Sequence, residues 1–308
     1  MKWLTVLLLA LVLVLPGCSR QERQSGKLQV VTTLFPLYDF ARTIGGEKAQ
    51  VTLLLPPGVE PHSFEPRPED VVRVNRADLF VFTNEVMEPW GAKIISGLDK
   101  GKVTVVEGGR GIPLMQGPVS DQHREGHADA HDGRGGDPHI WLDFDNARTI
   151  ARNILAAYVT RDPANKAYYE QNAAELDRQL AALDQRFKDT LASCPKKVLL
   201  HGGHYAFGYM AKRYGLKYIS ASAVNADAEP TPAKLAELVQ VMRREHLGYV
   251  YTEELLSPRV AETIARETGA KVLTLRAGHN VTKDDLQKGV TFISLMDENL
   301  KNLKAGLQ

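Results

Sequence analysis

The sequence has few cysteines and almost no net charge. Two cysteines among 308 residues exclude a disulfide framework and a zinc module built on cysteines. The 38 Lys and Arg residues nearly balance the 37 Asp and Glu residues, so a net charge of +1 gives no general attraction to nucleic acid, which we do not expect as a partner. Apolar residues at 44 % and charged residues at 24 % are ordinary for a globular protein and exclude wholesale disorder.

The motifs of several common enzyme classes are absent. The sequence contains no His-Glu-x-x-His pair, no Gly-x-Ser-x-Gly elbow and no Gly-x-Gly-x-x-Gly loop. A zinc hydrolase would need three histidines and a metal-bound water, together with a positioned general base and a pocket for an organic substrate. These absences favour a binding protein over an enzyme.

The sequence also lacks a long apolar run near its start. The run from Leu4 to Leu15 holds about twelve residues, which is too short to span a bilayer as a stable helix. Because Lys2 precedes it, the run predicts a signal peptide over residues 1–17.

The end of this segment carries a possible lipid-attachment site. Leu15-Pro16-Gly17-Cys18 resembles the lipobox of bacterial lipoproteins, in which the cysteine is lipidated and becomes the first residue of the mature chain. Pro16 departs from the pattern, because a small or β-branched residue is commoner there. We expect a lipidated tether over residues 18–27, the alternative being an ordinary signal peptide that contains Cys18 by chance.

From Leu28 onward the chain alternates between strands and helices. Apolar and β-branched runs predict strands over 28–33, 51–55, 79–83, 103–106, 197–200, 217–220, 248–252 and 271–275. Helices are expected over 37–44, 68–77, 145–159, 163–192, 206–214, 232–244, 259–268 and 289–303. The alternation indicates an α/β fold with mostly parallel sheets flanked by helices.

The helix expected from Pro163 to about Ala192 is long. Its apolar residues recur every three or four positions and form one stripe: Leu176, Leu180, Leu183, Phe187 and Leu191. Roughly thirty helical residues span about 45 Å, which exceeds the width of a small domain. Since the chain length favours two domains, we expect residues 161–194 to join a first lobe over 28–160 to a second lobe over 195–308.

Residues 113–137 interrupt the alternation. They are polar and glycine-rich without an apolar period, which predicts a mobile loop within the first lobe. Three histidines recur there every four residues between acidic side chains: His123, His127 and His131. A flexible loop can gather imidazoles and carboxylates around a cation with modest affinity, so we expect an auxiliary weak metal site; a solvated linker is the alternative.

Four other histidines occupy more informative positions. His62, His204 and His279 each follow a predicted strand, and His139 leads into a helix. In open α/β sheets ligands bind outside the carboxyl ends of the strands, so these histidines indicate one shared cleft. For any one of them, the alternative is a loop histidine or a hydrogen-bonded core histidine.

The residues around three of these histidines resemble those of a known family. The segments are Pro57-Gly-Val-Glu-Pro-His62-Ser-Phe-Glu-Pro66, Asp137-Pro-His139-Ile-Trp-Leu-Asp143 and His204-Tyr-Ala-Phe-Gly-Tyr-Met-Ala-Lys-Arg-Tyr-Gly215. With Glu262-Thr-Ile-Ala-Arg-Glu-Thr-Gly-Ala-Lys-Val272, they resemble the zinc- and manganese-binding lipoproteins of bacterial ABC importers, especially the branch of zinc-uptake protein A. The resemblance runs from about Leu28 to Leu303. It implies two α/β lobes joined by a long rigid helix, with the metal in the cleft between them.

Carried over position by position, the resemblance implies that His62, His139 and His204 are metal ligands. The family often places a carboxylate directly after the last strand of the second lobe, whereas here His279 follows that strand with no acid before Asp284. The fourth ligand therefore stays open between His279, a water and Glu60. His201 is expected behind the ligands or on the surface, and His246 is expected to be structural.

The ligand chemistry favours Zn²⁺, because imidazole suits zinc whereas Mn²⁺ prefers carboxylate, carbonyl and water oxygens. The resemblance implies an extracytoplasmic lipoprotein, in the periplasm or on the cell surface, that captures Zn²⁺ and delivers it to an ABC permease. We expect it to be a membrane-anchored monomer and not an enzyme. A zinc-dependent hydrolase and a manganese-binding or adhesin member of the same family are the alternatives.

Overall fold

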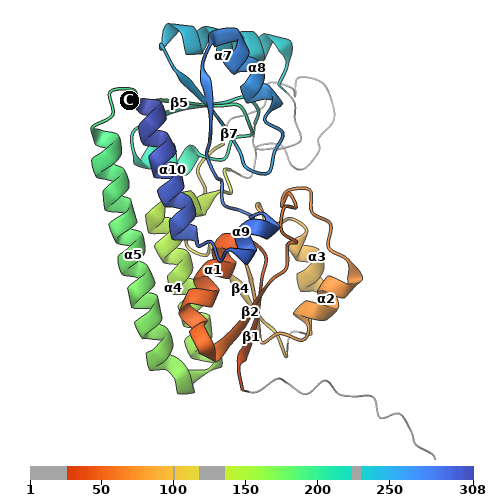
Figure 1. Ribbon diagram of the computed structural model, residues 1–308. Helices are drawn as coiled ribbons and strands as arrows, with labels where there is room; N and C mark the ends of the chain where they lie inside the picture. Colours follow the sequence, from red (N-terminus) through yellow and green to blue (C-terminus); the bar gives the residue numbers. More distant parts are fainter. Residues whose placement is uncertain (1–25, 100, 118–135, 224–229) are drawn as a thin grey trace, which may run out of the picture.

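The computed structural model describes residues 26–99, 101–117, 136–223 and 230–308. These residues form two lobes, each built on a four-stranded sheet in which every pair of strands is parallel (Figure 1). The first sheet has the order β2-β1-β3-β4 and the second has the same arrangement, β6-β5-β7-β8. Their strands are β1 (Leu28–Thr32), β2 (Ala49–Leu53), β3 (Leu79–Phe82), β4 (Thr104–Glu107), β5 (Val198–His201), β6 (Lys217–Ser220), β7 (Tyr249–Thr252) and β8 (Lys271–Thr274). The predicted α/β fold of two parallel-sheet lobes is confirmed.

Helices cover both faces of each sheet. On β1, Val30 packs into a core with α1 (Phe35–Gly45) and α4 (Phe144–Arg161), whereas Val31 packs with α2 (Pro68–Val74) and α3 (Gly91–Ser96) on the other face. On β5, Leu199 packs with α6 (Gly208–Arg213), and Leu200 packs with α7 (Pro232–Arg244) and α8 (Arg259–Thr268). Consecutive residues of a strand point to opposite faces, so strands buried on both faces are continuously apolar.

The long helix is α5 (Lys166–Ala192), which lies along one side of both lobes (Figure 1). It packs against α1, α4 and α10 (Phe292–Leu307). All five residues of its predicted apolar stripe are buried, so the expected linking helix is present. Arg186 of α5 also pairs with Asp297 of α10 at 2.5 Å.

Helix α10 likewise extends across both lobes. At its start, the backbone N–H of Phe292 donates to Asp39 Oδ2 of α1 at 2.8 Å. At its end, the carbonyl of Leu307 accepts from the N–H of Lys196, just before β5, at 3.1 Å. Two long helices, α5 and α10, therefore connect the lobes.

Several predicted boundaries are wrong for local reasons. The helix expected from Gly289 begins only at Phe292, because Gly289 has a φ of +69° and the Thr291 side chain caps the helix by accepting from the N–H of Ser294. A separate short helix, α9 (Lys283–Gln287), precedes it. Pro163–Asn165 forms its own 3₁₀ turn before α5. Among the described residues, no helix has both the length and the apolar character needed to cross a membrane.

Candidate metal centre

Four histidines from four separate segments meet where the carboxyl ends of the two sheets face each other. His62 follows β2, His204 follows β5 and His279 follows β8, while His139 directly precedes the 3₁₀ turn Ile140–Leu142 that leads into α4. Their ring centroids lie 5.1–6.3 Å apart. His139, His204 and His279 are buried, and His62 is partly exposed. The structure thus brings together the four histidines that the sequence singled out.

The turn after β5 places His204, and it requires glycine. A Cβ on Gly202 would lie 2.8 Å from the backbone of Ala261 on α8. A Cβ on Gly203 would lie 2.5 Å from Glu253 Oε1. Because a side chain at either position would meet these atoms, only a Gly-Gly turn lets the chain pass and carry His204 to the centre.

Three histidine nitrogens lie close enough together to share one cation, since they all lie within 4.8 Å of one another. His139 Nε2 lies 3.3 Å from His62 Nε2 and 3.2 Å from His204 Nε2. Tetrahedral zinc with Zn–N bonds of 2.0–2.1 Å requires nitrogens about 3.3–3.4 Å apart. A single Nε2 of His139 cannot satisfy two imidazole neighbours by donating one proton, whereas one cation between the three nitrogens would satisfy all of them.

Carboxylates contact the Nδ1 atoms of two of these rings. Asp137 Oδ1 lies 2.8 Å from His139 Nδ1, and Glu253 Oε1 lies 2.7 Å from His204 Nδ1. A carboxylate at Nδ1 keeps the proton on that nitrogen, which leaves the Nε2 lone pair free for a metal. The hydrogen bond to Asp137 therefore holds His139 in the tautomer that coordination requires, and the charge of Glu253 favours the same tautomer of His204.

Burial keeps the imidazole nitrogens of His62 and His139 available to a cation at neutral pH. Burial, together with repulsion from His139 and His204, lowers the pKa of His62 well below 6.5. Burial and repulsion from His204 likewise lower the pKa of His139. Since both imidazoles are neutral at pH 7, a cation would not have to displace a proton from either ring.

His279 lies beside these three histidines, and carboxylates rather than imidazoles dominate the electrostatics around its ring. Its ring centroid is 6.1–6.3 Å from the other three, which lie 5.1–5.6 Å from one another. Its Nε2 is 3.5 Å from Glu60 Oε2. Burial lowers the pKa of His279, but Glu60, and then Glu254 and Glu253, outweigh that effect and raise it to about 9. His279 and Glu60 thus occupy the fourth side of the cluster as an ion pair.

The remaining predicted histidines have other positions. His201 is fully buried behind His204, with its Nε2 3.8 Å from Glu253 Oε1. His246 is exposed after α7 and has a φ of +49°. The lipidation candidate Cys18 and the loop histidines lie outside the described residues; the latter are His123, His127 and His131.

Glu253 is a site residue that the sequence analysis missed. It directly follows β7, so the rule that drew attention to the histidines after strand ends also applied to it. Asp137 was visible in the segment around His139, but nothing in the sequence indicated that its carboxylate would contact the ring of His139.

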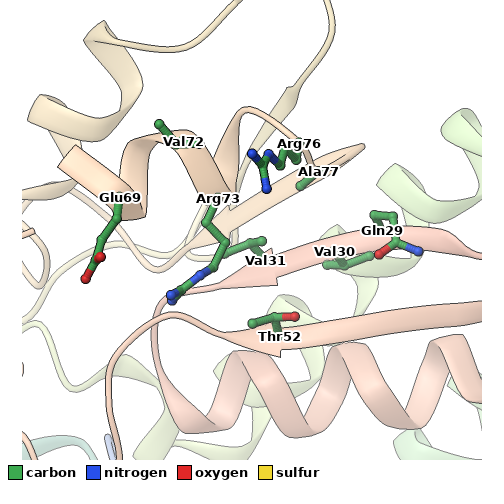
Figure 2. A pocket seen from close by; sticks show the side chains of 9 residues that line it. All are labelled: Gln29, Val30, Val31, Thr52, Glu69, Val72, Arg73, Arg76 and Ala77. Atoms are coloured by element: carbon green, nitrogen blue, oxygen red, sulfur yellow. The ribbon is translucent and has the colours of Figure 1, made fainter. Parts of the chain in front are cut away.

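A separate cavity lies in the first lobe, away from the histidines. Figure 2 shows it between α2 and the strands β1 and β2, where Arg73 and Thr52 point toward it. Its volume is about 360 Å³, and its lining includes Arg76, Glu69 and the exposed Val72 but none of the four clustered histidines.

The chain is similar to proteins of known function. The family model described as "Zinc-uptake complex component A periplasmic" matches residues 30–306. The high-affinity zinc uptake system protein ZnuA of Bacillus subtilis (strain 168) is 37 % identical over 286 residues, which is 93 % of this chain and 89 % of that protein. The zinc-binding lipoprotein AdcA of Streptococcus pneumoniae is 36 % identical over 305 residues, 99 % of this chain but 61 % of that longer protein. The crystal structure of its Zn(II)-bound ZnuA-like domain has a TM-score of 0.78 at 34 % identity, covering 92 % of this chain and 99 % of the domain.

Proposed function

The chain belongs to the family of periplasmic zinc-uptake components, and from this premise we propose that it captures one Zn²⁺ ion between its lobes and delivers it to an ABC permease. The observation that carries the proposal is the position of His139 Nε2, which lies 3.3 Å from His62 Nε2 and 3.2 Å from His204 Nε2, as two edges of a zinc tetrahedron require. Zinc is the cargo of the site and not the cofactor of a reaction.

The donor set favours zinc over manganese. Three imidazole nitrogens form the cluster, and imidazole suits zinc, whereas manganese prefers oxygen donors. The carboxylates of Asp137 and Glu253 contact the outer nitrogens of the rings and so offset the cation's charge without coordinating it. Such a centre would hold zinc firmly without any oxygen ligand from the protein.

The fourth ligand in this proposal is His279. In a tetrahedral shell of imidazoles, ring centroids would lie about 5.2 Å apart, so His279 must approach by about 1 Å after it loses its proton. If it is a ligand, His279→Ala should weaken zinc binding about 10- to 100-fold. If Glu60 or a water completes the shell, the affinity of that variant should barely change.

A zinc hydrolase is the weaker alternative. The relatives are named for zinc uptake and zinc binding, and not for an enzymatic activity. Assays of the zinc-loaded protein with ester and peptide substrates should therefore show no turnover. Robust hydrolysis that disappears in His62→Ala would contradict the transport function.

The metal can be tested directly. Elemental analysis of the purified chain after dialysis should find one tightly held zinc ion, which a comparable concentration of Mn²⁺ should not displace. His62→Ala should lose this ion, whereas His246→Asn, which removes an exposed imidazole and tolerates the positive φ, should retain it. Displacement by manganese, or retention of zinc by His62→Ala, would contradict the proposal.

The proposal also covers the location of the protein and its attachment to the membrane. The relative AdcA is named a lipoprotein, and we propose that this chain is likewise a lipoprotein. In this proposal it is a monomer, held outside the cytoplasm by a lipid on Cys18. The loop histidines would then add weak zinc binding near the same membrane. Deleting residues 119–134 should leave the tight site intact and remove only the weaker binding, as measured by titration calorimetry. Loss of the tight site would contradict this assignment.

A further inference from the structure

A buried asparagine joins the two lobes beside the candidate metal centre. Asn280 follows His279 and is fully buried. Its amide nitrogen donates to the carbonyls of Pro56 and Val59, each at 2.8 Å, and its Oδ1 accepts from the N–H of Val281. The two carbonyls belong to the segment of the first lobe that ends at His62, so one side chain of the second lobe holds that segment.

Backbone hydrogen bonds reinforce the same junction. The N–H of Gly58 donates to the carbonyl of Val281 at 2.9 Å, and the N–H of Phe35 donates to the carbonyl of His279 at 3.1 Å. The residues of the segment are otherwise open to solvent from Pro56 to Gly58. From Pro56 to Val59, the segment is therefore held in place by its contacts with the second lobe.

The first lobe holds this segment near its other end. The indole Nε1 of Trp90 donates to the carbonyl of Pro61 at 2.9 Å, next to His62. His62 is nevertheless the one partly exposed member of the four clustered histidines. A ligand that swings away to release the cation would most readily be His62, and its segment could move only if the bonds to Asn280 broke.

We propose that Asn280 is a positioning residue, which holds the His62 segment against the lobe that carries His204 and His279 and thereby sets the rate at which bound zinc leaves. The inference rests on the proposed function, because it needs zinc at the centre. It does not depend on which group is the fourth ligand. Opening the segment would leave the buried amide of Asn280 without its acceptors, and that cost keeps the segment closed.

The first lobe offers a matched control. Asn153 of α4 also donates its amide nitrogen to two carbonyls, those of Gly108 at 2.8 Å and Arg110 at 3.0 Å. Both acceptors belong to the same lobe as Asn153, and none of these residues contacts the clustered histidines. Asn153→Ala therefore removes the same number of donated hydrogen bonds, from a less buried side chain, without loosening the junction between the lobes.

The test is the rate of zinc release into excess chelator, followed by stopped flow on the full chain. Asn280→Ala should accelerate release on the order of 10-fold, since two buried hydrogen bonds are lost, whereas Asn153→Ala should change the rate less than about 2-fold. Asn280→Ser, whose short hydroxyl cannot replace both donated bonds, should also accelerate release and serves as a second variant if the alanine variant folds poorly. Circular dichroism establishes that each variant is folded.

A double-mutant comparison separates positioning of His62 from effects on the neighbouring His279. If Asn280 acts through His62 and not through His279, Asn280→Ala should accelerate release as much in a His279→Ala background, which still binds zinc, as in the wild type. Unchanged release from both Asn280 variants would overturn the inference, as would the loss of the acceleration in the His279→Ala background. A lowered melting temperature without faster release would show a merely structural role. If the wild-type chain retains no zinc, the proposed function itself fails.

Discussion

Zinc affinity should depend on pH through His279. Burial lowers the pKa of this imidazole, but the carboxylates of Glu60, Glu254 and Glu253 raise it to about 9. At pH 7 the protonated form therefore exceeds the neutral form by about 100-fold. Because a metal can bind only the deprotonated nitrogen, His279 as the proposed fourth ligand must give up this proton to zinc at a cost of about 2.7 kcal/mol.

The sign of the dependence follows from the raised pKa. The metal-free site holds the proton below pH 9 and loses it as the pH rises, so the apparent Kd should fall about tenfold for each pH unit between 7 and 9 and then level off. His62 and His139 add nothing in this range, because their pKa values are lowered and both rings are already neutral. Glu60 is already ionised, since His279 outweighs burial and lowers its pKa.

Competition with a chelator of known pH dependence measures the apparent Kd at each pH. Calorimetry at pH 7 in two buffers of different ionisation enthalpy should report about one proton released per zinc bound. His279→Gln is the matched control, because it removes the titrating ring while keeping a polar side chain of similar length. Its affinity should be flat between pH 7 and 9.

Two results would refute the reasoning. A wild-type Kd that stays constant from pH 7 to 9 would show that zinc displaces no proton from His279, as expected if Glu60 or a water is the fourth ligand. A slope that persists in His279→Gln would show that another group is responsible.

Three further predictions concern the surroundings of the site, the junction of the lobes and the anchor. Glu253→Gln should weaken zinc binding about 10- to 100-fold in a calorimetric titration, because the amide no longer fixes the proton on His204 Nδ1; an unchanged affinity would contradict that role. Arg213→Met should lower the free energy of unfolding in a urea titration by about 3 kcal/mol, since it leaves Asp184 and Asp143 without their shared partner. Burial raises the pKa of Asp184, but Arg213 and Lys188 outweigh it and hold the pKa below its usual 3.8. The stabilisation by Arg213 should therefore be present at neutral pH and lost only in strong acid. If Arg213→Met lowers the free energy of unfolding by less than about 0.5 kcal/mol at pH 7, this reasoning is refuted. Cys18→Ala should release the protein from membranes without changing its zinc affinity, and unchanged membrane partitioning of that variant would count against lipidation.

The fold was predictable because its elements have strong local signals. Strands buried on both faces appear as short apolar runs, and the stripe on α5 marks a helix that is buried along one side. The sequence analysis did not find the helices α3 (six residues) and α9 (five residues). Helices this short carry little periodic signal, and α6, which also has six residues, was predicted with bounds that are too wide at both ends.

The site was predictable only where a residue's place along the chain determines its place in space. His62, His204 and His279 follow strand ends, and the carboxyl ends of parallel strands share one edge. The pairing of Glu60 with His279 joins different lobes, as does the contact of Asn280 with Pro56 and Val59. Such contacts depend on how the lobes pack, and no local pattern encodes them.

The presence of two connecting helices has a mechanical consequence. A single connecting helix would let the two lobes twist or bend about it. Here α5 and α10 pack side by side, and Arg186 of α5 forms an ion pair with Asp297 of α10. Rotating one lobe against the other would shear that contact and pull α10 away from Asp39 at one end and Lys196 at the other. The two helices therefore resist a hinge-like opening of the lobes. Binding and release of zinc are then left to movements of short surface segments, which leave α5 and α10 in place.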